Sequence, residues 1–180
     1  MPEQLTLSID AMGGDNAPDM VIEGIQVALK KQPDLKFLLF GDEAILAPYL
    51  EHYVFASEAC EVRHTSHVIT NEETVAHALR SGRNSSMRLA INAVNYGEAA
   101  GIISAGNTGA LMAMAKFVLK TLPGIDRPAI ASYFPTERGQ SIMLDLGANV
   151  ICDSDNLVQF AVMGEVFARN VLGLAQPSVG

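Results

Sequence analysis

The part of the sequence best suited to chemistry is the short segment SAGNTG at residues 104–109. Its two glycines lack a Cβ, so the backbone can turn tightly and approach a ligand closely. Asn107 and Thr108 are favourable N-cap residues, and the free N–H groups of a first helical turn bind anions. The segment therefore predicts a phosphate-binding loop. The alternative is an ordinary turn between a strand and a helix, in which glycine and asparagine serve only the backbone geometry. The candidate ligands are Ser104, Gly106, Asn107, Thr108 and Gly109.

Two other polar loops come directly after stretches that predict strands. Residues 10–16 follow the alternating pattern of residues 5–10, and residues 146–149 follow the strand pattern of residues 141–145. In an open α/β sheet, ligands bind outside the carboxyl ends of the strands, so the three loops could meet in one crevice. For each aspartate there, bracing or capping a loop is the competing role. The candidate binding residues of these two loops are Asp10, Gly13, Gly14, Asp15, Asn16, Gly147 and Asn149, and the candidates for a catalytic role are Ser104, Asn107 and Asp145.

The motifs of several common sites are missing from the sequence. It has no Walker-type lysine and no GxGxxG fingerprint, which argues against an ordinary nucleotide site. Cys60 and Cys152 are far apart and lack CxxC spacing, so we expect no zinc site and no other metal or cofactor. The four histidines lie outside recognisable catalytic motifs, and we interpret them as surface or packing residues: His52, His64, His67 and His77.

The composition favours a folded α/β protein. The 180 residues are 49% hydrophobic with a mean hydropathy of +0.21, which fits a buried sheet rather than a disordered chain. No run reaches the ~18–20 apolar residues of a membrane-spanning helix. The net charge of -8 argues against nucleic-acid binding, and it means that an anionic substrate needs a local basic patch. Two cysteines without a disulfide pattern favour the reducing cytoplasm.

The periodicity predicts a parallel sheet covered by helices. A strand at residues 5–10, a helix beginning at Pro18 and a strand at residues 35–41 form a β-loop-α-β unit, whose crossover implies parallel strands. Residues 99–103 predict a short buried strand directly before the SAGNTG loop. The other expected elements are a helix capped by Asp42 that Pro48 kinks or delays, a weaker strand at residues 60–64, an irregular surface stretch at residues 65–82, a helix capped by Asn84 and a helix at residues 110–120.

The last third of the chain predicts a hairpin and a long helix. Strand patterns at residues 129–134 and 141–145 flank the turn residues 136–139, so one strand should run antiparallel to the rest. Asp153 can cap the final helix. Together the elements predict a three-layer α/β/α fold with a mostly parallel sheet and an antiparallel hairpin, in a single domain. The final five residues resemble the lead-in to another strand, so we expect the chain to be the N-terminal part of a longer protein.

Several segments in combination resemble the bacterial phosphate acyltransferase family, PlsX. The resemblance covers nearly the whole chain and implies a fold like those of phosphate acetyltransferases and of isocitrate and isopropylmalate dehydrogenases. Members of the family are about twice as long as this chain, and the missing half would complete the active site. The segments are DAMGGD at residues 10–15, SAGNTGALMA at 104–113, RPAI at 127–130, LDLGANV at 144–150 and NLVQFAVMG at 156–164.

The resemblance implies transfer of a fatty acyl group from acyl carrier protein to orthophosphate, giving acyl phosphate for phospholipid synthesis. It also implies a cytoplasmic homodimer that can associate peripherally with the inner membrane surface. Phosphate is a competent nucleophile, so holding both reactants in line and stabilising the developing oxyanion can drive the reaction without an acyl-enzyme. Two alternatives stay open: a dehydrogenase of the related fold, whose metal and nicotinamide signatures are absent, and a non-catalytic phosphate- or acyl-binding module. We expect the 180-residue piece to be inactive alone.

Arg80, Arg83 and Arg88 form a local positive cluster in this acidic chain. Acyl carrier protein has an acidic surface, so the cluster is expected to help dock it. A solvated helix entrance is the competing interpretation. Members of the family are usually richer in lysine at this position, so the sequence departs from their pattern here.

Overall fold

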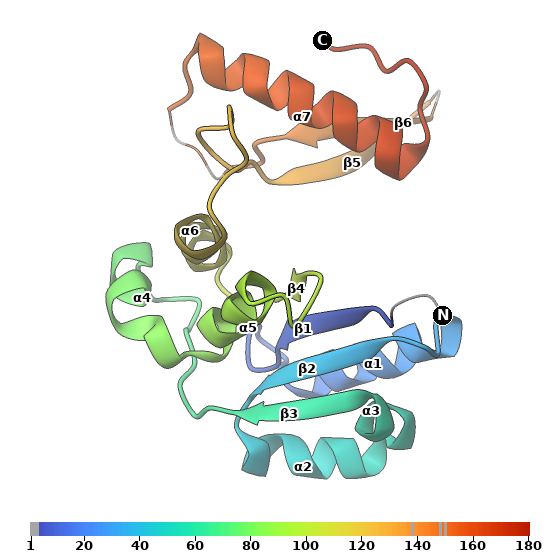
Figure 1. The fold of residues 1–180 in the computed structure, drawn as a ribbon, viewed down its shortest axis with the longest axis vertical. Coiled ribbons are helices and arrows are strands. Elements are labelled where there is room, and N and C mark those ends of the chain that lie inside the picture. The colour runs from blue at the N-terminus through green and yellow to red at the C-terminus, as the bar shows by residue number, and fades with distance from the viewer. Residues whose placement is uncertain (1–3, 138, 148, 150) are drawn as a thin grey trace. The chain divides into compact units, whose positions relative to one another are not determined.

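The computed structural model describes residues 4–137, 139–147, 149 and 151–180 (Figure 1). The chain divides into two compact units, unit 1 at Met1–Lys120 and unit 2 at Thr121–Gly180. The expectation of a single domain over the whole chain stays a prediction. Arg138 of the expected turn, and Ala148 and Val150 of the LDLGANV segment, lie outside the described residues.

Unit 1 contains a four-stranded parallel sheet in the order β3-β2-β1-β4. In the register of the central pairs, Thr6 lies opposite Lys36 and Ser8 lies opposite Ile102. Because the strands are parallel, the loops that follow β1 and β4 lie at the same edge of the sheet. The strands are β1 at Thr6–Asp10, β2 at Lys36–Gly41, β3 at Cys60–His64 and β4 at Ile102–Ile103.

Helices cover both faces of this sheet, since the side chains of β1 and β2 alternate between the faces. On one face, Ile9, Phe37 and Leu39 pack with buried residues of α1, α2 and α3. On the other face, Leu38 and Phe40 pack with α5. The helices of unit 1 are α1 at Asp19–Lys31, α2 at Glu43–His52, α3 at Val54–Ala59, α4 at Val75–Ser81, the 3-10 turn η1 at Gly82–Asn84, α5 at Ser86–Asn95 and α6 at Thr108–Leu119.

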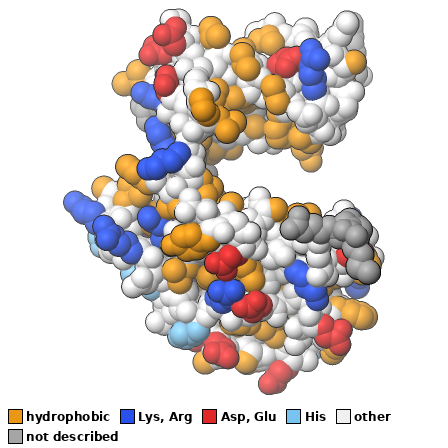
Figure 2. Space-filling model, in the orientation of Figure 1, with side chains coloured by type: hydrophobic (Ala, Val, Ile, Leu, Met, Phe, Trp, Pro, Cys, Tyr) orange, Lys and Arg blue, Asp and Glu red, His pale blue; other side chains and the backbone are white. Residues whose placement is uncertain are grey.

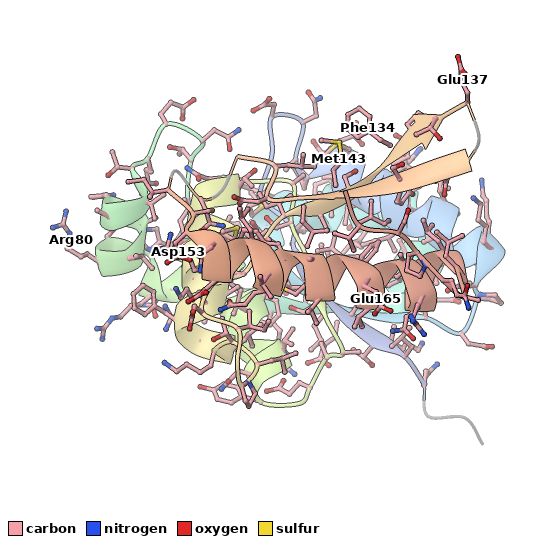
Figure 3. All side chains as sticks on the ribbon, turned by 90° about the horizontal axis from the view of Figure 1, so that it is seen from above. Arg80, Phe134, Glu137, Met143, Asp153 and Glu165 are labelled. Atoms are coloured by element: carbon pink, nitrogen blue, oxygen red, sulfur yellow. The ribbon has the colours of Figure 1, made fainter. Side chains whose placement is uncertain are left out.

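Unit 2 consists of an antiparallel hairpin and one long helix. Strands β5 at Ala131–Thr136 and β6 at Gly139–Leu144 pair as the sequence predicts. Helix α7 at Ser154–Leu172 begins with a capping box, in which the Asp153 carboxylate accepts from the backbone N–H of Asn156 at 2.9 Å. The side chains of Phe134 and Met143 point away from α7 and are exposed (Figure 3). The expected α/β class, with a mostly parallel sheet and an antiparallel pair, is confirmed.

Several local expectations are wrong. The stretch at residues 65–82 contains α4 and is not a loose surface segment, because Ile69 and Ala78 are buried against α5 and α6. Ser85 caps α5 in place of Asn84, and its buried hydroxyl accepts from the backbone N–H of Arg88 at 3.2 Å. Helix α2 begins at Glu43, directly after its predicted cap Asp42, so Pro48 does not delay its start, and a kink at Pro48 stays a prediction.

Strand β4 also differs from its expected form. It has two residues where the sequence predicts five, and Ile103 is 50% exposed where a buried strand is expected. The preceding residues still bond to β1, since the Ser8 N–H donates to the Gly101 carbonyl at 2.9 Å. The path of the chain into the SAGNTG loop is therefore fixed by β1.

Candidate functional site

Two of the three predicted loops meet at the carboxyl edge of the sheet in unit 1. The Ser104 hydroxyl donates to Asp10 Oδ2 at 2.7 Å, at the end of β1. The same hydroxyl oxygen accepts from the backbone N–H of Gly106 at 3.1 Å. Ser104 thereby joins β1 to the turn that leads into α6.

Glycines allow the two loops to approach closely. A Cβ on Gly13 would lie 2.3 Å from Asp10 Oδ2 and 3.0 Å from the backbone nitrogen of Gly106. A Cβ on Gly106 would lie 3.2 Å from the Gly13 Cα. Gly14 has a φ of +111°, which residues with a side chain rarely adopt, and a Cβ there would lie 3.1 Å from the Ala105 carbonyl oxygen. Close contact between the two loops therefore requires glycine at positions 13, 14 and 106.

Asp10 is buried beneath this contact, with 2% of its surface exposed. Burial raises the pKa of its carboxyl, and the hydroxyls of Ser86 and Ser104 and the backbone N–H groups of Met12 and Gly13 lower it in part. Among the described residues, neither Asp10 Oδ1 nor the nearby Ser86 Oγ has a hydrogen-bond partner of good geometry. Ser86 is the first residue of α5, so the carboxyl lies near the positive end of that helix.

Asn107 connects the SAGNTG loop to residues 70–73, which we call the strap. Its Oδ1 accepts from the backbone N–H of Ala110 at 3.0 Å and caps α6, as the sequence predicts. Its Nδ2 lies 3.0 Å from the Glu73 carbonyl oxygen and 3.3 Å from those of Thr70 and Asn71. Both ends of the amide therefore hold structure, and a catalytic role for Asn107 stays a prediction.

The strap reaches the first loop as well. Asn71 Nδ2 donates to Asp15 Oδ1 at 2.8 Å, so the strap contacts both loops of the candidate site. These polar groups lie at the rim, in contrast to the buried Asp10 carboxyl beneath them. The exposed candidates are Asp15, Asn16, Thr108 and Gly109.

The third loop belongs to unit 2 and has its own network. Asp145 Oδ1 accepts from the Asn149 backbone N–H at 3.2 Å and from its side-chain amide at 2.8 Å. Asp145 and Gly147 have φ values of +63° and +89°, so the loop turns sharply. Burial raises the pKa of the Cys152 thiol, and the neighbouring Asp145 carboxylate raises it further. The Cys152 Sγ lies 3.3 Å from Asp145 Oδ2. Convergence of this loop with the other two stays a prediction.

The three arginines predicted to dock a carrier protein all belong to unit 1. Arg80 and Arg83 are exposed, and Arg88 is half-buried with its Nε donating to Asn92 Oδ1 at 3.3 Å. Figure 2 shows Lys and Arg side chains beside exposed apolar ones on the α4 side of this unit. Two of the arginines line a hollow whose residues are Leu79, Arg83, Arg88, Asn92 and Phe117.

The sequence reasoning missed the strap and Ser86. The strap carries no motif of its own, and its contacts come from residues more than thirty positions away. Ser86 follows another serine at a helix start, so the sequence offers a capping signal there but no sign that Ser86 faces Asp10.

The site in unit 1 has the groups of an anion site, and phosphate binding there stays a prediction. It offers free backbone N–H groups at the N-terminus of α6, hydroxyls and a buried carboxyl. Within the described ranges, no three His, Cys, Asp or Glu residues come together in a way that could hold a metal ion. No helix in the same ranges is long and apolar enough to cross a membrane.

Comparison with known proteins defines first the fold and then the family. The EutD phosphotransacetylase from Staphylococcus aureus superposes with a TM-score of 0.60 at 18% identity, over 92% of this chain and 53% of that one. A similarity at this identity establishes a shared α/β fold. The family described as "Fatty acid synthesis protein" matches residues 5–180, and the chain belongs to this family.

Relatives within the family carry a more specific name. The chain is 61% identical over 180 residues to a protein of Rhodospirillum centenum named "Phosphate acyltransferase", and 57% identical to one of the same name from Rhodospirillum rubrum. It is covered completely in both alignments, and it spans about half their length, 51% and 52%. The resemblance to the phosphate acyltransferase family is thereby confirmed.

Proposed function

We propose that the full-length protein transfers a fatty acyl group from an acyl carrier protein thioester to orthophosphate, giving acyl phosphate for phospholipid synthesis. The observation that carries the proposal is the 61% identity, over the entire chain, to a protein named "Phosphate acyltransferase". The anion site of unit 1 agrees with it, because phosphate is the substrate that such a reaction must hold.

In this proposal the SAGNTG loop binds the phosphate. The N–H groups at the start of α6 and the positive end of that helix stabilise its negative charge. Bound phosphate attacks the thioester carbonyl, and donors fixed in the site stabilise the oxyanion that develops. When the oxyanion collapses, the C–S bond breaks, and the carrier thiol leaves as acyl phosphate forms. Holding the two reactants in line replaces an encounter in solution. No acyl-enzyme is needed.

Trapping of the product tests the reaction. The full-length protein is mixed with acyl carrier substrate, phosphate and hydroxylamine, and acyl hydroxamate is measured against reactions without phosphate and without enzyme. We expect acyl hydroxamate to form only when both phosphate and enzyme are present. Binding of phosphate without hydroxamate would support the non-catalytic binding module instead, and nicotinamide reduction would support the dehydrogenase. The 180-residue piece alone is expected to give no turnover.

Thr108→Val tests the proposed ligand loop in the full-length enzyme. The hydroxyl of Thr108 is exposed, so its loss should raise the KM for phosphate by about tenfold if it meets a charged ligand, with little change in Tm. Thr6→Val makes the same chemical change at the opposite end of β1 and should leave this KM unchanged. A lower Tm with normal phosphate kinetics would assign Thr108 to the helix start alone.

We propose that acyl carrier protein docks on the hollow that contains Arg83 and Arg88, with Arg80 nearby. The exposed charges suit an acidic partner, and Phe117, which is 61% exposed, supplies apolar contact area. Reversing Arg83 and Arg88 to Glu should raise the KM for carrier substrate, most strongly at low salt. Reversing the exposed Lys30 and Lys31 changes the net charge equally and serves as the control. Equal effects of both pairs would contradict a local docking site.

We also propose that the protein is a cytoplasmic homodimer that associates peripherally with the membrane. Support for self-association comes from unit 2, where α7 exposes Leu157, Val158, Val162 and Val166. Sedimentation of the full-length protein tests the dimer, and flotation with anionic lipid vesicles tests the membrane association.

A further inference from the structure

The direction of the hydrogen bonds at Ser104 limits what this side chain can bind. A serine hydroxyl has one hydrogen and two lone pairs. Its hydrogen is donated to Asp10 Oδ2 at 2.7 Å, and one lone pair accepts from the Gly106 N–H at 3.1 Å. The free position on the half-buried Ser104 is therefore a lone pair, which accepts hydrogen bonds and cannot donate them.

The buried position of Asp10 keeps this arrangement fixed. The carboxyl is 2% exposed, and the groups that approach it are the hydroxyls of Ser86 and Ser104 and the backbone N–H groups of Met12 and Gly13. All of these groups can donate, and none of them carries a charge. The same carboxylate oxygen occupies the space that a Cβ on Gly13 would fill, so Gly13 allows the loop to close over Asp10.

We propose that Asp10 and Ser104 make the loop selective for an anion that carries its own proton, and so for orthophosphate over sulfate and phosphomonoester dianions. The inference rests on the proposed binding of phosphate at the SAGNTG loop. Above neutral pH, orthophosphate keeps one P–OH, which can donate to the free lone pair of Ser104. Sulfate and a monoester dianion, whose second pKa is about 6, have only acceptor oxygens. Each of these anions places an oxygen lone pair against the free lone pair of Ser104, and the contact is unfavourable because two lone pairs repel each other.

Asp10 is a positioning residue in this scheme, since it acts through the Ser104 hydroxyl. In an Asp10→Asn variant, the new side-chain amide can donate to Ser104. The Ser104 hydrogen is then free to turn toward the ligand and bind sulfate. Ser104→Ala removes the selective group altogether. The matched control is Ser8→Ala, because Ser8 lies on the same strand and donates to the Ala90 carbonyl of α5 at 2.7 Å, away from the loops.

The test compares anions on the full-length protein at pH 8. Competition against the phosphate-dependent reaction gives the inhibition constants of sulfate, methyl phosphate and arsenate, and calorimetry gives their binding constants without turnover. We expect sulfate and methyl phosphate to bind at least about tenfold more weakly than phosphate, and arsenate, which keeps a proton, to bind like phosphate. In the Asp10→Asn and Ser104→Ala variants, the ratio of the dissociation constant of sulfate to that of phosphate should fall to within about threefold. Ser8→Ala should leave this ratio unchanged.

The outcomes separate the two proposals. Sulfate binding as tightly as phosphate to the wild-type protein would overturn the selectivity, whether or not the variants fold. Variants that fold and bind phosphate with an unchanged ratio would do the same. A wild-type protein that neither binds nor consumes phosphate would instead overturn the proposed function.

Discussion

Substitution of Gly13 by alanine tests the close contact between the two loops. The new Cβ would lie 2.3 Å from Asp10 Oδ2, whereas carbon and oxygen normally stay about 3.3 Å apart, so one of them must move by about 1 Å. The carboxylate is short, buried and bonded to Ser104, and the same Cβ would lie 3.0 Å from the backbone nitrogen of Gly106. Movement therefore breaks the Ser104 bond or shifts the loop.

The expected cost follows from these two effects. Overpacking costs about 1–3 kcal/mol, and loss of a hydrogen bond to a charged group costs about 1.5–3 kcal/mol. The two costs overlap, because a single movement of the carboxylate causes both, so we expect Gly13→Ala to lower the free energy of unfolding by about 2–5 kcal/mol. Gly24→Ala is the matched control, since a Cβ there meets nothing within 4 Å in the middle of α1, and it should stabilise by about 0.5–1 kcal/mol.

Denaturation by urea, monitored by circular dichroism, measures both variants on the same chain. The midpoint should fall for Gly13→Ala and rise slightly for Gly24→Ala, at a constant m-value. A Gly13→Ala protein within about 1 kcal/mol of the wild type would mean that the loops can separate at little cost. Close packing of the two loops would then not explain the glycine at position 13 of the DAMGGD motif.

Three further predictions concern side chains around the site and in the sheet. Asn107→Ala should lower the free energy of unfolding by about 2–4 kcal/mol, because it removes the cap of α6 and frees three strap carbonyls. Hydrogen exchange should then increase at residues 70–73, and unchanged exchange would contradict a role of Asn107 in holding the strap. Burial raises the pKa of Cys60 to about 12, so iodoacetamide should label it far more slowly than a free thiol at pH 8, and fast labelling of the folded chain would refute this. The hydrogen bond from His77 lowers the pKa of Glu73 below 4.5, so this pair stabilises the fold above that pH, and the contribution is lost on acidification. Glu73→Gln should therefore cost under about 1 kcal/mol at pH 7 and should reduce the loss of stability in acid. Urea titrations at pH 7 and pH 3.5 measure both effects.

Elements with a strong local signal could be predicted from the sequence. Strand β2 contains the continuous apolar run at residues 37–40, and the residues of β1 alternate in type, so both could be assigned without knowledge of their neighbours. The cap and acidic start of α7 are equally local, and Asp153 has the predicted role. The hairpin followed from the few turn residues between two strand patterns.

Elements that depend on distant contacts could not be predicted in the same way. Helix α4 is only seven residues long, too short to show a clear helical period, and it is fixed because Ala78 packs in a cluster with Met87 and Met114. The choice of Ser85 over Asn84 as a cap also depends on tertiary structure, because both residue types cap well. Ser85 is fully buried, and its hydroxyl also donates to the Gly82 carbonyl at 2.7 Å, so a contact with the preceding turn accompanies the cap.

The same distinction decides which candidate ligands are free to bind. Local rules identify Asn107 as an N-cap, but they do not reveal that its amide nitrogen is held by carbonyls 34 to 37 residues earlier in the chain. Asp10 is likewise a strand-end carboxylate in the sequence, and only the neighbouring β4 loop makes it a buried acceptor for Ser104. Asn107 and Asp10, which the sequence suggested as ligands, therefore hold the loops in place. Contact with the proposed phosphate is left to the backbone N–H groups of α6, the Thr108 hydroxyl and the free lone pair of Ser104, and the selectivity that we propose follows from the orientation of Ser104.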